Sequence, residues 1–237
     1  LMLWPEEEYG GLGLEDFRYE QIILEETNYA MCSDWYNSLH SRLVGPYIGR
    51  FGNAEQKQRF LPKCVTGETI LAVAMTEPDA GSDLAGMRTT AKDMGDHWLV
   101  NGAKTYISNG INADVVVVAA KTDPENNPHC MGLFLVERGM PCFERGRKLK
   151  KMGMMAQDTA ELFFTNVKVP KANVLGDATK GFYYLMDGLA EERLIGAAGY
   201  IAVAQKAFDI TVDYVQQRKA FGKKIADFQN TQFTLAA

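Results

Sequence analysis

The chain has 237 residues, of which 46% are hydrophobic and 23% are charged, so it holds enough apolar residues for a sizeable core and one or two domains. Its net charge is −5 at pH 7 and its Lys and Arg residues are scattered, which argues against a protein that binds nucleic acid. The longest apolar run, at 115–120, is far too short to span a bilayer, so no transmembrane segment is expected.

Residues 1–68 are expected to form a helical domain. Apolar residues recur at helical spacing between Glu15 and Met31, and Asn53 followed by Gln56 has the form of a capping box. The helix that this box begins is expected to end near Pro62. The chain opens without a charged-then-apolar leader, and we expect that the true N-terminus, with part of this domain, lies outside it.

Residues 69–176 are expected to form a β domain, a sandwich or small barrel, because short β-branched and aromatic runs alternate regularly with turn residues. Two hairpin turns are predicted, one at 93–96 and one at Asn101-Gly102. The predicted strands are Ile70–Met75, Thr89–Asp93, His97–Asn101, Lys104–Ile107, Val115–Lys121, Met131–Val136, Phe143–Lys148 and Ala160–Val169.

Residues 177–237 return to a helical period. An apolar stripe begins at Phe182 and continues to Val215, and the segment 218–222 is expected to end this long helix. A further helix is predicted from Ala226. Two amphipathic helices cannot bury such a stripe alone, so we expect both further bundle helices and association with other copies. The fold class predicted for the whole chain is α+β.

The four cysteines and three histidines are too far apart in sequence to match the spacing of a zinc site. We therefore expect no metal, and reduced, packed thiols in a reducing compartment. These residues are Cys32, Cys64, Cys130, Cys142, His40, His97 and His129.

The segment from Val73 to Ser82 is the first candidate for a binding site. It reads as a strand that opens into a loop, in which Pro78 and Gly81 shape the backbone and Thr76 and Ser82 supply short hydroxyls. Such a loop can present free N–H groups to a flat or anionic ligand. The same composition is equally typical of an ordinary solvated β-turn.

The second candidate is Tyr106-Ile107-Ser108, at the end of a predicted strand. An aromatic ring beside a hydroxyl suits a planar ligand, because the ring covers one face and the hydroxyl reaches an edge nitrogen. Taken alone, Tyr106 could equally belong to the core.

Four segments, in this order and spacing, resemble the acyl-CoA dehydrogenase family over nearly the whole chain. They are Pro5–Gly13, Thr76–Asp83, Asn101–Asn109 and Arg218–Lys223. Two further stretches, Lys151–Phe164 and Gly181–Arg193, are most similar to the long-chain type of that family.

The resemblance implies a helical N-terminal domain, a flavin-binding β middle domain and the start of a C-terminal four-helix bundle. It implies FAD between the β domain and the bundle, with Thr76 at the pyrimidine edge, Ser108 beside N5 and Ser82 near the acyl-CoA. Arg218 and Gln229 would hold the pyrophosphate and adenosine part of FAD across a dimer interface. The residues that would line the flavin are Val73, Ala74, Met75, Thr76, Gly81, Ser82, Tyr106, Ile107 and Ser108.

The reaction implied by the resemblance needs a carboxylate that removes the α-proton of a thioester while a hydride leaves the β-carbon. The long-chain and isovaleryl types carry this base on the first bundle helix, directly before an Arg, and here Glu192 precedes Arg193. Tyr183 matches a position that contacts substrate, and Glu191, Glu192 and Arg193 are taken as substrate-binding residues with it.

The helical period gives separate support for Glu192. It shares a face with Leu189 and Ile195 beside small glycines, and a carboxylate on such an apolar stripe should have a raised pKa, as a general base needs. The period alone does not exclude Glu191. Both glutamates could also be solvated helix acids paired with Arg193 or Lys206.

The sequence therefore predicts FAD-dependent α,β-dehydrogenation of medium-to-long acyl-CoA thioesters in fatty acid β-oxidation. Electrons would pass to electron-transfer flavoprotein, from a homotetramer in the bacterial cytoplasm or the mitochondrial matrix. Three alternatives stay open: a branched-chain (isovaleryl) dehydrogenase, an enzyme that resembles acyl-CoA oxidase, and an inactive homologue that binds acyl-CoA or flavin.

Overall fold

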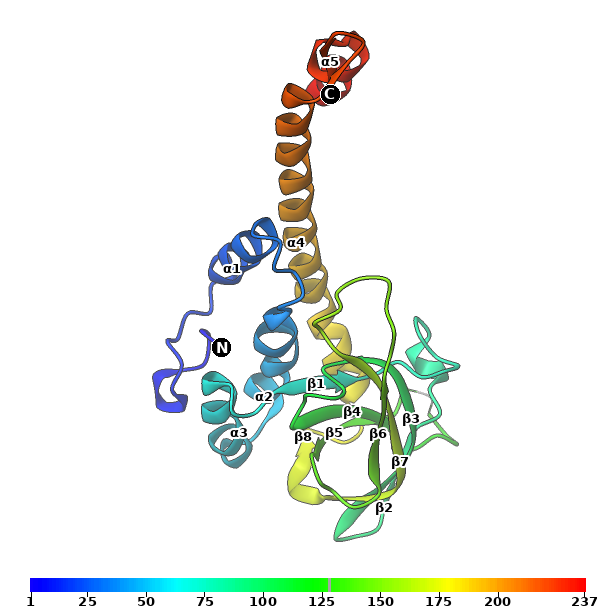
Figure 1. Ribbon diagram of the computed structural model, residues 1–237. Helices are drawn as coiled ribbons and strands as arrows, with labels where there is room; N and C mark the ends of the chain where they lie inside the picture. The colour runs from blue at the N-terminus through cyan, green and yellow to red at the C-terminus, as the bar shows by residue number, and fades with distance from the viewer. Residues whose placement is uncertain (128) are drawn as a thin grey trace.

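A computed structural model describes residues 1–127 and 129–237, which form N-terminal helices, a β-sheet and one long C-terminal helix (Figure 1). The helices are α1 (Phe17–Tyr29), α2 (Gly45–Phe51), α3 (Ala54–Thr66), α4 (Gly181–Gln217) and α5 (Gln229–Ala236), with a π-helical segment, η2, at Leu39–Val44. The strands are β1 (Leu71–Ala74), β2 (Thr90–Asp93), β3 (His97–Ser108), β4 (Val115–Lys121), β5 (Met131–Glu137), β6 (Phe143–Lys148), β7 (Thr159–Pro170), β8 (Val174–Leu175), β9 (Lys219–Ala220) and β10 (Lys223–Lys224).

The capping box predicted at the start of α3 is confirmed. Asn53 accepts a hydrogen bond from the backbone N–H of Gln56 (2.8 Å), and the Gln56 side chain accepts one from the N–H of Asn53 (2.9 Å). The predicted end near Pro62 is wrong, because the helix continues to Thr66. Leu61 and Cys64 are fully buried on either side of the proline, and their packing outweighs the one hydrogen bond that proline cannot make.

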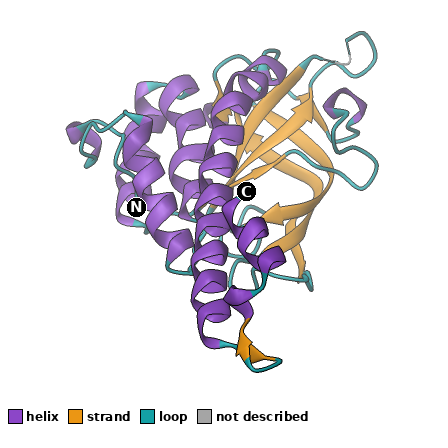
Figure 2. Cartoon of the chain, turned by 90° about the horizontal axis from the view of Figure 1, so that it is seen from above, coloured by secondary structure: helices purple, strands orange, loops and turns teal. Residues whose placement is uncertain are grey.

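The predicted α+β class with a β layer is confirmed. The sheet has the order β6-β7-β3-β2-β4-β5-β8, and β1 pairs in parallel with β4. Helices gather on one side of it in Figure 2. Strand β4 is buried on both faces: 115, 117 and 119 belong to the core shared with the helices, whereas 116, 118 and 120 belong to a second core inside the curved sheet. This double burial explains the unbroken apolar run in the sequence.

The hairpin turn predicted at 93–96 is confirmed, but the one at Asn101-Gly102 is wrong. Strand β3 runs without a break from His97 to Ser108, and β7 pairs with both halves of it. The pairing shifts register between Val100 and Gly102, because β7 uses three residues, from Val167 to Phe164, where β3 uses two. The dipeptide therefore lies opposite a bulge in β7, at which Asn166 has a φ of 56°. A hairpin there would give up the long pairing with β7, which is why the local turn preference is overridden.

Helix α4 is a single helix, as predicted, and at 1.5 Å per residue it is about 56 Å long. It packs against α1, and α5 lies at its far end (Figure 1). It ends at Gln217, where β9 and β10 form a small hairpin, so α5 begins at Gln229 and not at Ala226. Large apolar residues along α4 are exposed, among them Leu194, Ile201 and Phe208.

The cysteines in the described part of the chain are all free thiols. Cys64 is buried, but Cys32 and Cys142 are exposed, so the expectation of packed thiols is wrong for those two. Both lie in irregular segments at the surface, outside the two cores. Within residues 1–127 and 129–237, no helix combines the length and apolar content needed to cross a membrane, and no cluster of three His, Cys, Asp or Glu side chains is placed to hold a metal.

Candidate active site

The two candidate segments lie side by side. After β1 the chain passes along β3, where the carbonyl oxygen of Thr76 accepts a hydrogen bond from the N–H of Thr105 (2.9 Å). The Nζ atom of Lys104 also donates to the carbonyl oxygen of Met75 (3.0 Å). These bonds fix the segment after β1 next to the end of β3 that carries Tyr106 and Ser108.

A buried ion pair holds this junction together. Lys104 Nζ lies 2.8 Å from Glu77 Oε1, and the two side chains are 0% and 4% exposed. Glu77 also accepts hydrogen bonds from the N–H groups of Arg88 and Thr89. Burial lowers the pKa of Lys104 to about 8. Burial raises the pKa of Glu77, but the Lys104 charge and the N–H donors outweigh it and leave that pKa below its usual value.

No motif in the sequence marks Lys104 and Glu77 as a pair. One signal was available: Lys104 has the same strand parity as Trp98 and Val100, which point into the inner core. A lysine at an inward position needs a buried anion. The sequence could not tell which of the nearby acids supplies it.

Tyr106 stands out from the sheet at a second register shift, between Lys104 and Ile107. Its φ is 57° and its side chain is 70% exposed, whereas Ile107 is buried and Ser108 is half-buried. The bulge therefore turns the aromatic ring of Tyr106 to the surface. The buried Ile107 follows directly, and the hydroxyl of Ser108 is two residues away. This arrangement can cover one face of a planar ligand.

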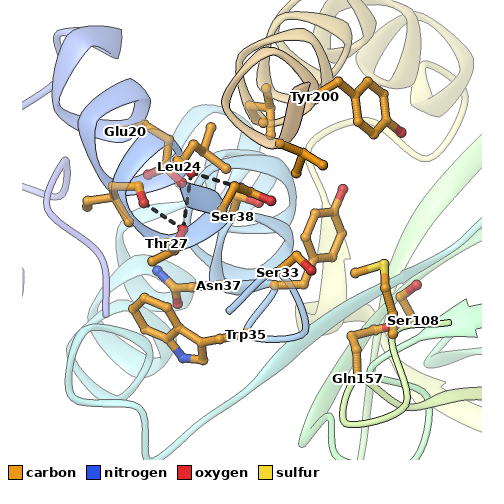
Figure 3. Close-up of a pocket in the computed structure, with 18 residues that line it drawn as sticks. Glu20, Leu24, Thr27, Ser33, Trp35, Asn37, Ser38, Ser108, Gln157 and Tyr200 are labelled. Carbon is orange, nitrogen blue, oxygen red and sulfur yellow. Dashed lines mark hydrogen bonds between the residues drawn. The ribbon is translucent and has the colours of Figure 1, made fainter. Parts of the chain in front are cut away.

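A cavity of about 390 Å³ lies between α1, the segment 33–38, the tip of β3 and α4 (Figure 3). Ser108 and Gln157 form its β side, and Leu24 and Tyr200 come from the helices. The Nε2 atom of Gln157 and the hydroxyl of Ser38 are buried, and each lacks a hydrogen-bond partner among the described residues. Unpaired polar atoms in a mostly apolar cavity indicate a ligand or water site.

Helix α4 supplies one wall of this cavity, through Ile195, Gly196, Gly199, Tyr200 and Val203. The two glycines leave space where side chains would otherwise project. The cavity therefore lies along the face of α4, starting about one turn after Glu192.

Glu191 and Glu192 have different partners in the structure. Glu191 forms salt bridges with Arg42 and Arg50 of the N-terminal helices. Glu192 is half-buried, and its Oε1 accepts a hydrogen bond from the hydroxyl of Tyr47 (3.1 Å). Burial raises the pKa of Glu192, against the opposing effects of Tyr47 and Arg193.

Glu192 does not line the cavity that contains Ser108. Glu192 lies one helical turn before Gly196 of the cavity wall, in a separate small hollow. That hollow is also lined by Tyr47, Gly188, Glu191, Arg42 and Arg50. Thr76, Ser82 and Tyr106 are not part of the cavity wall either. Among the predicted residues, the structure thus brings Ser108 into the cavity and places Glu192 beside it.

The other predicted residues divide between the core and the surface. Ala74 is fully buried in the inner core, Val73 and Met75 are half-buried against the core shared with the helices, and Gly81 is exposed. Tyr183, in the first turn of α4, is 64% exposed, and Arg193 is also exposed. Arg218 and Gln229 are exposed at the far end of α4. Arg218 is about 39 Å along the helix axis from Glu192, so it cannot reach the Ser108 cavity of its own chain.

Three family models match consecutive parts of the chain. They describe the acyl-CoA dehydrogenase N-terminal domain at residues 1–68, the middle domain at 72–167 and the C-terminal domain at 179–237. The chain belongs to the acyl-CoA dehydrogenase family.

Relatives within this oxidoreductase family are similar over almost the whole chain. The mitochondrial long-chain specific acyl-CoA dehydrogenase of Sus scrofa is 48% identical over 232 residues, which are 97% of this chain and 54% of that protein. The mitochondrial isovaleryl-CoA dehydrogenase of Pongo abelii is 42% identical over 231 residues, 97% of this chain and 55% of that protein. The chain thus spans about half the length of the curated relatives it matches.

Solved acyl-CoA dehydrogenases share the fold. An acyl-CoA dehydrogenase from Geobacillus kaustophilus superposes with a TM-score of 0.95 at 53% identity, covering 100% of this chain and 62% of that one. One from Bacillus anthracis, complexed with FAD, superposes with a TM-score of 0.91 at 35% identity, covering 100% of this chain and 40% of that one.

Proposed function

We propose that this chain is part of an FAD-dependent acyl-CoA dehydrogenase that oxidises the α,β bond of medium-to-long acyl-CoA thioesters, with Glu192 as the base. The observation that carries the proposal is the contrast between two adjacent carboxylates. Glu191 is neutralised by two arginines, whereas Glu192 keeps a sheltered carboxylate, one helical turn from an apolar cavity.

The residues present fit FAD. The exposed ring of Tyr106 can cover a flavin face, and the unpaired Gln157 Nε2 offers a donor beside Ser108. The residues that would hold the flavin ring are Val73, Ala74, Met75, Thr76, Gly81, Ser82, Tyr106, Ile107 and Ser108. Arg218 and Gln229 of a second copy would hold the adenosine diphosphate part. FAD, when bound, supplies the acceptor for the hydride that leaves the β-carbon.

Glu192 would remove the α-proton of the thioester. Its half-burial raises the pKa of the carboxyl, so the carboxylate is a stronger base than a solvated glutamate. The apolar wall of α4 would bind the acyl chain and exclude water, at about 0.8 kcal/mol for each buried methylene. From Ile195 to Val203 this wall extends about 12 Å, which supports an extended acyl chain.

The proposed electron acceptor, assembly and location follow from the resemblance to the family. Electron-transfer flavoprotein is the proposed electron acceptor, and a homotetramer arranged as a dimer of dimers is the proposed assembly. Because relatives occur in mitochondria and in bacteria, the mitochondrial matrix or bacterial cytoplasm is the proposed location. The second candidate is a branched-chain dehydrogenase, favoured by the 42% identity to the isovaleryl-CoA enzyme.

The test is anaerobic bleaching of the flavin by acyl-CoA in the full-length protein. The visible absorbance of the flavin measures the bleaching. We expect Glu192→Gln to keep the yellow colour and to lose bleaching, and Glu191→Gln, the matched control, to keep both. Normal bleaching in Glu192→Gln would reject Glu192 as the base.

The same bleaching assay with a series of acyl-CoA substrates distinguishes the alternatives. Fastest bleaching by medium or long straight chains supports the main proposal, and fastest bleaching by isovaleryl-CoA supports the second candidate. Rapid reaction of the reduced enzyme with oxygen would instead indicate an oxidase. A protein that binds FAD without bleaching would indicate an inactive homologue.

A further inference from the structure

Tyr47 is held rigidly where α2 packs against α4. Its side chain is only 3% exposed and belongs to the core shared by the helices and the sheet. Its ring lies 6.4 Å from that of Phe51, which stacks on Tyr184 of α4 at 4.0 Å. The phenol ring therefore has a fixed position relative to the first turns of α4.

The hydroxyl of Tyr47 is directed at a single carboxylate. It donates to Glu192 Oε1 at 3.1 Å. The residue one turn earlier on α4 is Gly188, and a Cβ atom there would lie 2.9 Å from the Tyr47 hydroxyl and 3.4 Å from Glu192 Oε1. The absence of a side chain at 188 is thus what gives the phenol and the carboxylate room to meet.

The other charged groups near Glu192 do not replace this contact. Arg193, on the same helix, is exposed, and Arg42 and Arg50 are engaged by Glu191. Asp187 pairs with Arg50 at 3.5 Å. Tyr36 approaches from the segment before η2, and burial, with the charges of Tyr200 and Glu192, raises its pKa.

We propose that Tyr47 is a positioning residue, whose hydroxyl holds the Glu192 carboxylate in one orientation and stabilises its ionised form. This inference rests on the proposed function, because it assigns Glu192 the role of base. A hydrogen bond from a neutral donor to a carboxylate favours the charged form. Tyr47 therefore opposes the effect of burial on the pKa of Glu192 and favours the ionised carboxylate in its sheltered position.

The test is Tyr47→Phe in the full-length, FAD-loaded protein. Removal of the hydroxyl should move the acid limb of the pH profile of kcat/KM upward by about one pH unit, because the carboxylate loses a charge-assisted hydrogen bond. At pH values above the displaced limb, most of the rate should return. Gly188→Ala, which displaces the hydroxyl, should move the limb in the same direction.

Tyr9→Phe is the matched control. Tyr9 is another buried tyrosine of the same core, in the 3₁₀ turn Glu7–Tyr9, and its substitution should leave the acid limb unchanged. If the acid limb of the kcat/KM profile is also unchanged in Tyr47→Phe, while the wild type bleaches normally, the inference is overturned and the proposed function stays intact. A wild type that does not bleach overturns the proposed function.

Thermal unfolding against pH supplies a readout that does not need activity. A donor to the ionised carboxylate stabilises the folded state only once Glu192 is ionised. The melting-temperature difference between wild type and Tyr47→Phe should therefore widen as the pH rises through the pKa of Glu192. A difference that does not change with pH contradicts the stabilisation of the ionised form.

Discussion

Replacement of Lys104 by methionine should both destabilise the protein and weaken its hold on FAD. The substitution keeps a long apolar stem but removes the cation that faces Glu77, which would then be a buried carboxylate without a counter-charge. Removal of one partner of a buried ion pair typically costs about 3–5 kcal/mol. Glu77 keeps its two N–H donors, so we expect the lower end, about 3 kcal/mol.

For a protein of this size, each kcal/mol lowers the melting temperature by about 2–4 °C, so the expected decrease is about 6–12 °C. Thermal unfolding by circular dichroism measures it. The ratio of visible to ultraviolet absorbance of the purified protein should also fall, because Lys104 no longer fixes the Met75 carbonyl beside β3.

Lys92→Met is the matched control, since Lys92 is an exposed lysine on the neighbouring strand β2. It should change neither the melting temperature nor the flavin content. A melting temperature for Lys104→Met within about 1 °C of the wild type would refute the reasoning, because a buried carboxylate without a counter-charge should lower the stability by more than that.

Two glycine substitutions test the sheet and the cavity. Gly102→Ala should destabilise the protein by about 1–3 kcal/mol in thermal unfolding, because φ is 150° and a Cβ would lie 2.3 Å from Thr89 Oγ1. Gly153→Ala, in open space, is its control, and equal stability of the two variants would contradict the close approach of Gly102 to Thr89. Gly196→Leu should shift the preferred substrate toward shorter acyl chains in the bleaching assay, since a Cβ there meets nothing closer than Tyr200 at 3.7 Å and the larger side chain fills the cavity. An unchanged chain-length profile in Gly196→Leu would show that the acyl chain does not lie along α4.

Local sequence patterns determine several features of this fold. The capping box at Asn53 and the turn at 93–96 depend on residues within a few positions of one another, so neighbours in sequence decide them. The apolar run of β4 reflects burial on both faces, which composition alone signals. Predictions failed where a distant partner overrides a local preference, as β7 does at Gly102 and the core does at Pro62.

The same division applies to the candidate site. The helical period of α4 places Glu192 on an apolar stripe, and the order of the motifs indicates the family. Both features depend only on the positions of residues along the sequence. Only the packing of the N-terminal helices against α4 decided that Arg42 and Arg50 bind Glu191 and that Tyr47 binds Glu192. Those contacts join residues more than a hundred positions apart, and no periodic pattern encodes which of two adjacent side chains will meet which partner.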